Sequence, residues 1–261
     1  MSAPAQAATA AVLIGAGGRM GRAIIGVLAE FPQLRLAGAL AAAGSAALGR
    51  DSGELAGATA NGVPLTASLA ALLPAAQVVI DFSRAEALPA TLAACRAARK
   101  ALLIGTTGYQ ASLEREFEAA AREIPLLVAA NTSLGVTLLT ELARQAAHAL
   151  PQFAMRVSER HHVHKRDTPS GTALALAQAL RSGRGAGAAG VEIPIESRRE
   201  GDVIGDHTAL LHGPGEELFL GHRALDRRVF ARGAVAAALW LAPRPPGRYA
   251  MRDVLAGKTA T

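Results

Sequence analysis

The stretch Ala10-Ala-Val-Leu-Ile-Gly15-Ala-Gly-Gly-Arg-Met-Gly21 decides the fold class of this chain. Its first six residues form the short apolar run that is typical of a buried strand. The glycines that follow allow a sharp turn into a helix whose apolar face carries Ile24, Ile25 and Leu28. A turn of this kind brings backbone amides and a positive helix N-terminus to an anion such as a pyrophosphate. The stretch therefore predicts an α/β fold with a site for a dinucleotide.

The glycine spacing departs from the strict G-x-G-x-x-G pattern of dinucleotide-binding turns. It can be written Gly15-x-Gly17-x-x-x-Gly21 or, equally, Gly15-x-x-Gly18-x-x-Gly21. A tight strand-to-helix turn that binds nothing is therefore the alternative. The position of the turn between an apolar strand and an amphipathic helix favours the dinucleotide.

The chain lacks the acidic residue that usually grips the adenosine ribose, about 20 residues after the glycines. Ala41 and Ala42 hold that place. Without an acidic residue at this place, a preference for NAD is less strongly indicated, and no carboxylate there would repel the 2′-phosphate of NADP. Three basic residues are candidates to compensate: Arg19, Arg35 and Arg50.

Apolar runs with strand character continue at 34–40, 78–83, 101–105 and 126–130. Helical patterns lie between most of them, and this alternation predicts a doubly wound parallel sheet. The Gly/Ala-rich stretch 41–62 is expected to be an irregular loop. After Asn131 a helix over 134–150 precedes four strand-like runs: 153–159, 191–197, 203–211 and 217–222. Grouped strands with few helices predict an α+β domain with an open mixed sheet.

We therefore expect two domains. Residues 1–131 form the dinucleotide-binding domain, and residues 132–241 form the second domain. A group of prolines follows residue 242, and because proline ends regular elements we expect residues 242–261 to return to the first domain.

Composition narrows the class of protein. Hydrophobic residues make up 51% of the 261 residues and charged residues 18%, which provides a core and excludes wholesale disorder. The single cysteine excludes an internal disulfide framework and a cysteine-based zinc cluster. No apolar run or basic leader pattern indicates a membrane span or export, so a cytoplasmic protein is expected. The net charge of +6 leaves nucleic-acid binding as an alternative, which an aromatic content of only 3% disfavours.

Polar residues follow three of the predicted parallel strands: Asp81-Phe82-Ser83, Gly105-Thr106-Thr107-Gly108 and Ala129-Ala130-Asn131. Ligands of open α/β sheets bind beyond the carboxyl ends of the strands. The two threonines and Asn131 offer neutral hydrogen bonds that suit a nicotinamide carboxamide. Each segment alone could be an ordinary turn, but together with the glycine turn they outline a crevice for an extended cofactor.

The segment Glu159-Arg-His-His-Val-His-Lys-Arg-Asp167 concentrates basic groups just before Thr168-Pro-Ser-Gly-Thr172. Ser170 is a suitable helix cap, and Gly171 and Thr172 would then present amides at the positive end of a helix. A basic loop beside such a helix suits a small molecule with two carboxylates, and histidine can transfer a proton near neutral pH. The alternatives are a solvated basic loop, a phosphate or nucleic-acid patch, and a metal site, which the lysine would oppose.

With these motifs in place, the chain resembles the 4-hydroxy-tetrahydrodipicolinate reductases, also called dihydrodipicolinate reductases. The most specific part is Glu159-x-His-His-x-x-Lys-x-Asp-x-Pro-Ser-Gly-Thr172. The resemblance runs nearly end to end and includes the glycine turn, the three strand ends, Gly205-Asp-His-Thr208 and Met251-Arg-Asp-Val-Leu255. It implies a Rossmann-like N-terminal domain and a C-terminal domain that binds substrate and forms a homotetramer through its sheets.

The resemblance also implies an activity. The family uses NADH or NADPH to transfer hydride to C4 of a cyclic dicarboxylate while the 4-hydroxyl leaves as water, in lysine and diaminopimelate biosynthesis. His161 would be the acid/base residue and Lys165 the proton donor, and His162, Gly171 and Thr172 would hold the substrate carboxylates. No metal is implied. The cofactor contacts would be Gly15, Ala16, Gly17, Gly18, Arg19, Met20, Gly105, Thr106, Thr107, Ala129, Ala130, Asn131 and Thr132.

Members of the family commonly have an acidic and then a basic residue where Ala41 and Ala42 stand. The resemblance therefore leaves NADH and NADPH open, and loose dual specificity is the hypothesis. The functional alternatives are another two-domain NAD(P)-dependent reductase of a small amino-acid-like carboxylate and a basic binding protein without turnover.

Overall fold

The computed structural model describes residues 7–185 and 191–257, which form two compact units. The first unit contains the described residues up to Thr132 and those from Phe230 onward, and the second is Ser133–Val229. Residues 230–241 thus lie in the first unit, whereas the predicted division grouped them with the second. The reason is their contacts, because Arg232 binds the carboxylate of Glu30 at 2.6 and 2.9 Å.

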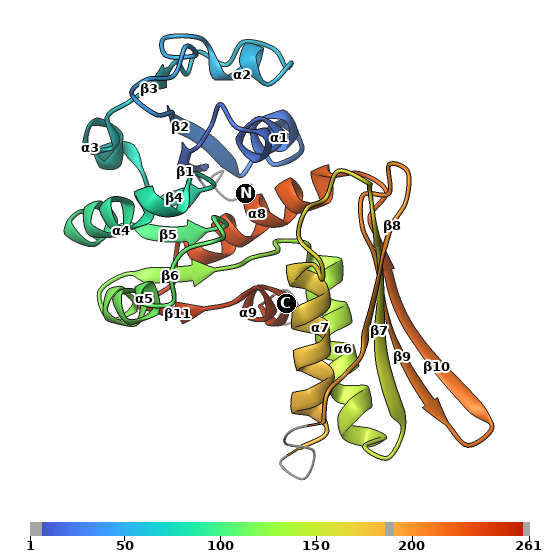
Figure 1. Ribbon diagram of the computed structural model, residues 1–261. Coiled ribbons are helices and arrows are strands. Elements are labelled where there is room, and N and C mark those ends of the chain that lie inside the picture. Colours follow the sequence, from blue (N-terminus) through green and yellow to red (C-terminus); the bar gives the residue numbers. More distant parts are fainter. Residues whose placement is uncertain (1–6, 186–190, 258–261) are drawn as a thin grey trace, which may run out of the picture. The chain divides into compact units, whose positions relative to one another are not determined.

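The first unit is built on a seven-stranded parallel sheet in the order β11-β6-β5-β4-β1-β2-β3 (Figure 1). Its strands are β1 (Thr9–Ile14), β2 (Leu34–Leu40), β3 (Leu65–Thr66), β4 (Val78–Asp81), β5 (Ala101–Ile104), β6 (Pro125–Val128) and β11 (Gly247–Tyr249). Its α-helices are α1 (Arg19–Val27), α2 (Ser52–Leu55), α3 (Leu69–Leu72), α4 (Leu88–Ala97), α5 (Leu113–Ala121) and α9 (Met251–Ala256), and α8 (Arg228–Leu241) lies in it from Phe230 onward. The strands β1, β4, β5 and β6 are almost continuously buried because helices cover the sheet. The Rossmann-like parallel sheet predicted from the sequence is confirmed.

Strand register aligns the carboxyl ends of the central strands. Asp81 is the shared member of this row, because it pairs with Ile14 of β1 on one side and with Ile104 of β5 on the other. Ile104 pairs in turn with Val128 of β6. The chain winds outward in both directions from the β1–β4 pair, which is the topological switch point where such sheets bind ligands.

The segment between β2 and β3, predicted to be an irregular loop, has a defined structure. The carboxylate of Asp51 accepts hydrogen bonds from four backbone N–H groups, those of Gly53, Glu54, Asn61 and Gly62, at 2.8 to 3.2 Å. Asp51 also caps α2. One side chain therefore joins the start of α2 to residues 61–62, through contacts that the Gly/Ala-rich composition does not reveal.

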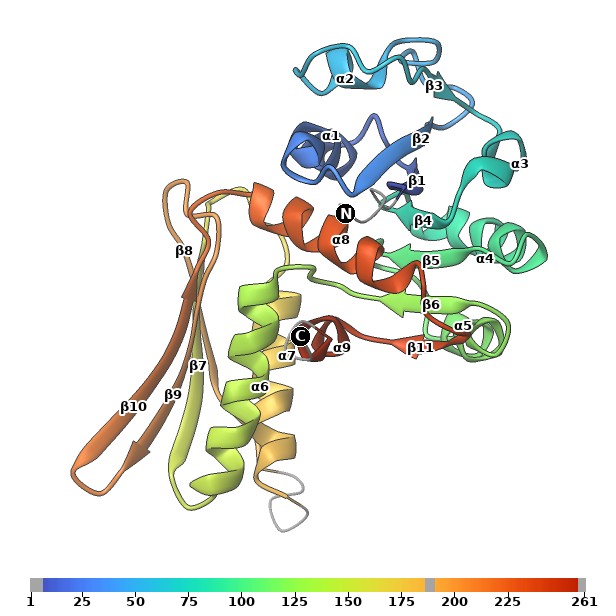
Figure 2. The same ribbon diagram turned by 180° about the vertical axis from the view of Figure 1, so that it is seen from behind.

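The second unit is a four-stranded mixed sheet in the order β10-β9-β7-β8, with helices on one face (Figure 2). Its elements are α6 (Leu134–Ala149), β7 (Ala154–His161), α7 (Gly171–Gly183), β8 (Ile195–Arg199), β9 (Asp206–Gly213) and β10 (Glu216–Arg223). The strands β7 and β8 are parallel and the other pairs are antiparallel, which confirms the predicted mixed sheet. Alternation along β7 turns Met155 and Val157 toward the core. Among the described helices none has the length and apolarity to cross a bilayer.

We expect two helical glycines to respond to alanine in opposite ways. A Cβ at Gly183 of α7 would lie 2.2 Å from the carbonyl oxygen of Arg144 in α6, so Gly183→Ala should destabilise by about 1–3 kcal/mol. Gly26 of α1 is exposed and has open space around it, so Gly26→Ala should stabilise by about 0.5–1 kcal/mol. Urea unfolding followed by circular dichroism measures both. Equal effects of the two changes would contradict the close α6–α7 contact.

Candidate functional site

The backbone of the glycine turn after β1 lies so close to the end of β4 that the turn has no room for side chains at this point. Gly15 has φ of +79°, and a Cβ there would lie 2.4 Å from the carbonyl oxygen of Phe82. A Cβ at Gly21 would lie 2.3 Å from the carbonyl oxygen of Gly15. Gly18, the N-cap of α1, has no side chain to accept hydrogen bonds from the first-turn amides. The turn therefore fits a pyrophosphate at the helix N-terminus.

A buried carboxylate organises the neighbouring strand ends. The side chain of Asp81 accepts hydrogen bonds from the backbone N–H and hydroxyl of Ser83 and from the hydroxyl of Thr106, at 2.8, 2.6 and 3.0 Å. The Phe82 ring packs over Gly105, where a Cβ would lie 2.1 Å from it. The Thr106 hydroxyl is thus used within the protein. Thr106 is buried, so Gly105 and Thr107 are the more exposed residues of this segment.

The remaining predicted cofactor residues lie at the same carboxyl edge of the first unit. Ala16 is buried and Ala129 nearly so, and the Thr132 hydroxyl donates to the carbonyl oxygen of Phe230 at 2.7 Å. The rest of the set is exposed or partly exposed: Gly17, Gly18, Arg19, Met20, Thr107, Ala130 and Asn131. The register of the parallel strands brings the segments that follow β1, β4, β5 and β6 to one edge.

In the second unit, strand pairing gathers a polar cluster around Glu159 of β7. Glu159 lies opposite His207 of β9 and Ser197 of β8, and its side chain has no exposed surface. Its Oε1 atom accepts hydrogen bonds from the Ser197 hydroxyl at 2.7 Å and from the Ser170 backbone N–H at 3.0 Å. Ser170 also caps α7 through a hydrogen bond from the Ala173 N–H. The carboxylate therefore joins β7, β8 and the start of α7.

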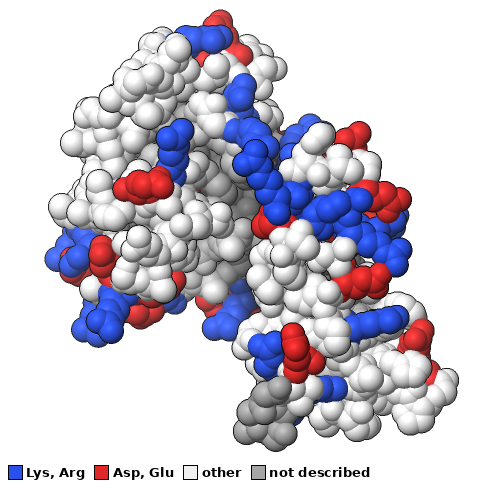
Figure 3. All heavy atoms as spheres, viewed as in Figure 1, with Lys and Arg blue, Asp and Glu red and all other residues white. Residues whose placement is uncertain are grey.

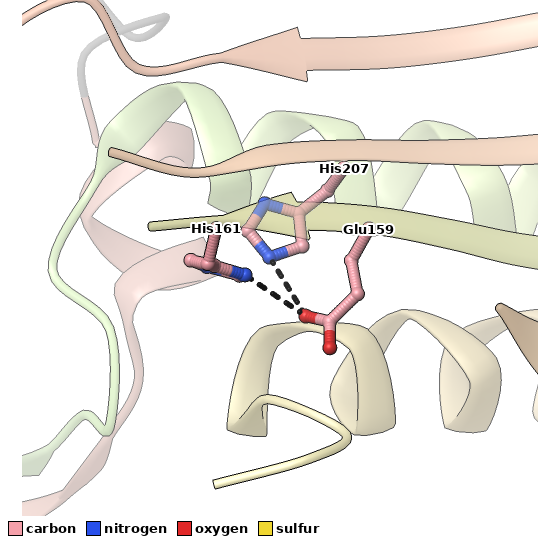
Figure 4. A group of neighbouring side chains, drawn as sticks. All are labelled: Glu159, His161 and His207. Atoms are coloured by element: carbon pink, nitrogen blue, oxygen red, sulfur yellow. Dashed lines mark ion pairs between the residues drawn. The ribbon is translucent and has the colours of Figure 1, made fainter. Parts of the chain in front are cut away.

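Two histidines lie against the other oxygen of this carboxylate (Figure 4). Nδ1 of His161 is 3.3 Å and Nε2 of His207 is 3.8 Å from Oε2 of Glu159. The two imidazole rings meet edge to face, with centroids 4.9 Å apart. Nε2 of His207 also lies 3.3 Å from the Ser170 hydroxyl oxygen. The predicted acid/base residue is thus almost entirely buried and held between a carboxylate and a second imidazole.

Burial and charge set the pKa values of the cluster. Burial raises the pKa of Glu159, but hydrogen bonds from Ser170 and Ser197 outweigh it and lower the pKa overall. Burial lowers the pKa of His161; the Glu159 charge opposes this shift, and the cations Lys165 and Arg199 add to it. Burial also lowers the pKa of His207, to about 4, with a further contribution from His161. At neutral pH the carboxylate is therefore charged and His207 is neutral.

The loop between β7 and α7 carries Lys165, whose ammonium lies 2.8 Å from both carboxylate oxygens of Asp167. Arg199 fastens this loop to β8. Its guanidinium binds the carbonyl oxygen of Asp167 and the hydroxyl of Thr168, and it approaches Oε1 of Glu159 at 3.5 Å. The lysine and the histidine therefore belong to one network that passes through Arg199 and Glu159.

The other predicted substrate residues border the same network. His162 follows His161 in the chain. Gly171 and Thr172 are the first residues of α7, directly after Ser170, which caps this helix. Sequence reasoning gave no role to Glu159, His207 or Arg199. His207 stands within the quoted Gly205–Thr208 motif, but only strand register places it opposite Glu159.

Glu159, His161 and His207 also form a donor set that a divalent cation could use, since their ligand atoms lie within 4.8 Å of one another. The surrounding charges oppose this reading. Arg199 contacts the carboxylate, and the Lys165 charge acts on His161, so a cation would meet two positive groups.

The parallel sheet, its glycine turn and the cluster of histidines and basic groups are those of a Rossmann-type oxidoreductase that uses a nicotinamide cofactor. Residues 9–132 match the family described as dihydrodipicolinate reductase, N-terminus, and residues 135–255 match dihydrodipicolinate reductase, C-terminus. The chain belongs to the dihydrodipicolinate reductase family.

Curated relatives agree with this assignment. A 4-hydroxy-tetrahydrodipicolinate reductase of Halorhodospira halophila is 42% identical over 93% of this chain and 97% of its own length. One of Alkalilimnicola ehrlichii is 44% identical over 95% of this chain and 98% of its own. The fold is similar to that of a dipicolinate-bound dihydrodipicolinate reductase from Paenisporosarcina sp. TG-14, with a TM-score of 0.77 and 23% identity over 93% of this chain and 97% of that one.

The depressed pKa of His207 predicts a pH-dependent stability. The unfolded chain binds a proton near pH 6.5 whereas the folded chain binds it only near 4, so the free energy of unfolding should fall as pH drops through this window. The slope from this residue is at most about 1.4 kcal/mol per pH unit. Urea unfolding between neutral pH and pH 4.5 should show a shallower fall for His207→Gln. The exposed His212 on the same strand provides the control, His212→Gln. Identical slopes for all three proteins would contradict the prediction.

Proposed function

We propose that this protein reduces 4-hydroxy-tetrahydrodipicolinate to tetrahydrodipicolinate, with loss of water, in lysine and diaminopimelate biosynthesis. Family membership supports the activity. The observation that carries the residue assignment is the single network that joins His161, Lys165 and the start of α7. A histidine, an ammonium group and helix amides in one place suit a small dicarboxylate that must also receive a proton.

In this proposal His161 is the acid/base residue and Lys165 the proton donor. Loss of the 4-hydroxyl and a ring proton as water first gives a conjugated imine. Hydride addition at C4 then moves negative charge onto the enamine, and a nearby ammonium can stabilise this charge and protonate it. His162, Gly171 and Thr172 bind the carboxylates of the substrate. Lys165 is paired with Asp167 in this structure, so the substrate would compete with Asp167 for the ammonium.

The nicotinamide cofactor supplies the hydride when it is bound. The residues proposed to hold it are those predicted from the sequence at the carboxyl edge of the first unit. The turn at Gly15–Met20 would take the pyrophosphate, and the segments Gly105–Thr107 and Ala129–Thr132 would take the nicotinamide end. The second unit would bind the substrate.

We propose loose dual specificity for NADH and NADPH. Asp51 is the acidic residue nearest to Ala41 and Ala42 in the sequence. Its carboxylate accepts hydrogen bonds from four backbone N–H groups and so is not placed to bind a ribose. Arg35 is the second residue of β2, at the end of the strand opposite the cofactor edge. Arg19 and Arg50 are the remaining candidates for a 2′-phosphate. The backbone of Arg50 binds Leu65, whose side chain lies beside Gly17.

We propose that four copies of this chain assemble into a homotetramer through the open face of the second unit's sheet. Helices α6 and α7 cover one face (Figure 2). Basic and acidic side chains are interspersed over this unit (Figure 3), and on the open face Arg160 and Arg223 both bind Asp206. This face contains a hollow of about 380 Å³. Alternating charges of this kind can complement a second copy of themselves.

A coupled assay tests the proposed reaction directly. The substrate is generated from pyruvate and aspartate semialdehyde by the preceding synthase, and loss of NADH or NADPH absorbance is followed. Oxidation that depends on this substrate is the expected result. A folded protein that oxidises neither cofactor would favour the alternative, another NAD(P)-dependent reductase of an amino-acid-like carboxylate.

Lys165→Ala should lower turnover by roughly 10² to 10⁴, the usual contribution of a general acid, and should leave cofactor affinity nearly unchanged. The reason is that the residue belongs to the second unit and the cofactor residues to the first. Steady-state kinetics and cofactor fluorescence titration measure the two quantities. His161→Gln should also alter the pH–rate profile. Unchanged turnover in Lys165→Ala would remove it from the mechanism.

The ratio of kcat/KM for NADH and NADPH should lie within about tenfold, or ~1.4 kcal/mol. Arg50→Ala and Arg19→Ala should lower kcat/KM for NADPH more than for NADH, because only NADPH carries the 2′-phosphate. Arg35→Ala is the matched control. A larger preference in the unchanged protein, or an equal effect of all three changes, would contradict the proposal.

A further inference from the structure

The proposed acid/base residue has a defined orientation, set by Glu159. The imidazole Nδ1 of His161 lies 3.3 Å from a carboxylate oxygen that has no exposed surface. If this nitrogen lacked its proton, its lone pair would lie close to a negative charge. The pairing favours a proton on Nδ1, which leaves Nε2 as the nitrogen that exchanges one.

The surroundings of Nε2 agree with this assignment. Gly205 lies beside it, and a Cβ at that position would stand 3.1 Å from His161 Nε2. A side chain there would crowd the nitrogen. The absence of one keeps this edge of the ring clear.

Glu159 itself is held from several directions. The hydroxyl of Ser197 and the backbone N–H of Ser170 fix one oxygen, and the Arg199 guanidinium lies 3.5 Å from the same atom. Arg199 also binds Asp167 and Thr168 in the loop that carries Lys165. A shift of this carboxylate would therefore disturb the histidine, the loop and the start of α7 together.

We propose that Glu159 is a positioning residue of the reaction centre: it fixes the tautomer and orientation of His161 and, through Arg199, the loop of Lys165. His207 supports the same oxygen as a neutral imidazole. The inference rests on the proposed function for its catalytic meaning, but its structural content is independent of activity.

The charged and titratable groups around His161 come from every neighbouring strand and from the loop. They are Glu159 on β7, Arg199 on β8, His207 on β9, and Lys165 and Asp167 in the loop, and His222 on β10 acts on His207. Among them, Glu159 is the nearest group that raises the pKa of His161. Neutralising it should therefore lower that pKa.

The variant Glu159→Gln keeps the shape of the side chain and removes its charge. Histidine NMR titration should show the pKa of His161 lowered by about one unit or more, with loss of the uniform Nδ1–H tautomer. The His161 signal is assigned with His161→Gln. The pH–rate limb that reports His161 should move to lower pH, and kcat should fall at least about tenfold, within the range of acid–base contributions. Cofactor affinity should stay unchanged.

The matched control is Glu200→Gln. Glu200 has a side chain 61% exposed, which binds Arg160 and takes no part in the network, so its neutralisation should leave the His161 titration and kcat unchanged. If Glu159→Gln does not fold, Ser197→Ala replaces it. It removes one hydrogen bond that fixes the carboxylate, and a smaller change of the His161 tautomer and titration is expected.

The outcomes separate the two proposals. An unchanged His161 tautomer and titration in the folded variants would overturn the positioning role, whatever the activity. A wild-type protein without reductase activity would overturn the proposed function, while the NMR result would still decide the role of Glu159. Loss of activity with a chelator and its recovery with Zn²⁺ would show that the three side chains form a metal centre, and would also overturn the inference.

Discussion

A negative charge without contact to water organises the second unit. Removing a carboxylate from water is costly unless hydrogen bonds and opposite charge replace the solvent. Glu159 receives these from β8, from the start of α7 and from Arg199, while the histidines of β7 and β9 close around its other oxygen. The positions of the basic loop and of the first turn of α7 follow from this requirement.

In the first unit the buried carboxylate at the carboxyl edge of the sheet is stabilised in a different way. Its organising carboxylate, Asp81, is also buried, but neutral hydroxyl and amide groups bind one of its oxygens, Oδ1. Glycines bring backbone close to backbone at the same edge. Amides and helix termini at such an edge suit a pyrophosphate, whereas the second unit gathers fixed charges and ionisable rings, which suit the small dicarboxylate proposed as its substrate. The two units thus present two kinds of polar surface.

Local patterns were enough to predict most of the sheet and the segments that border the site. Continuous apolar runs predicted β1, β4, β5 and β6, and the 159–172 motif marked the segment that contributes Glu159, His161 and Lys165 to the polar cluster. The short strands β3 and β11 escaped prediction because two or three residues carry no periodicity. The role of Asp51 was hidden because its partners include residues ten and eleven positions away.

The partners of Glu159 were hidden for a related reason. Ser197 and His207 lie 38 and 48 residues further along the chain, and only the pairing of β7 with β8 and β9 selects them. A shift of that register by one residue would turn His207 to the other face of the sheet. The sequence alone does not specify that register, so the second half of the site needed the structure.

The order of segments along the chain also has a consequence for synthesis. The second unit is continuous in sequence, but the first needs residues from Phe230 onward. A growing polypeptide can therefore complete its α+β half while its parallel sheet still ends at β6, with the edge that β11 later pairs left open. Unpaired strand edges invite association with other chains. The nascent protein is most vulnerable to aggregation in the interval before its last residues leave the ribosome.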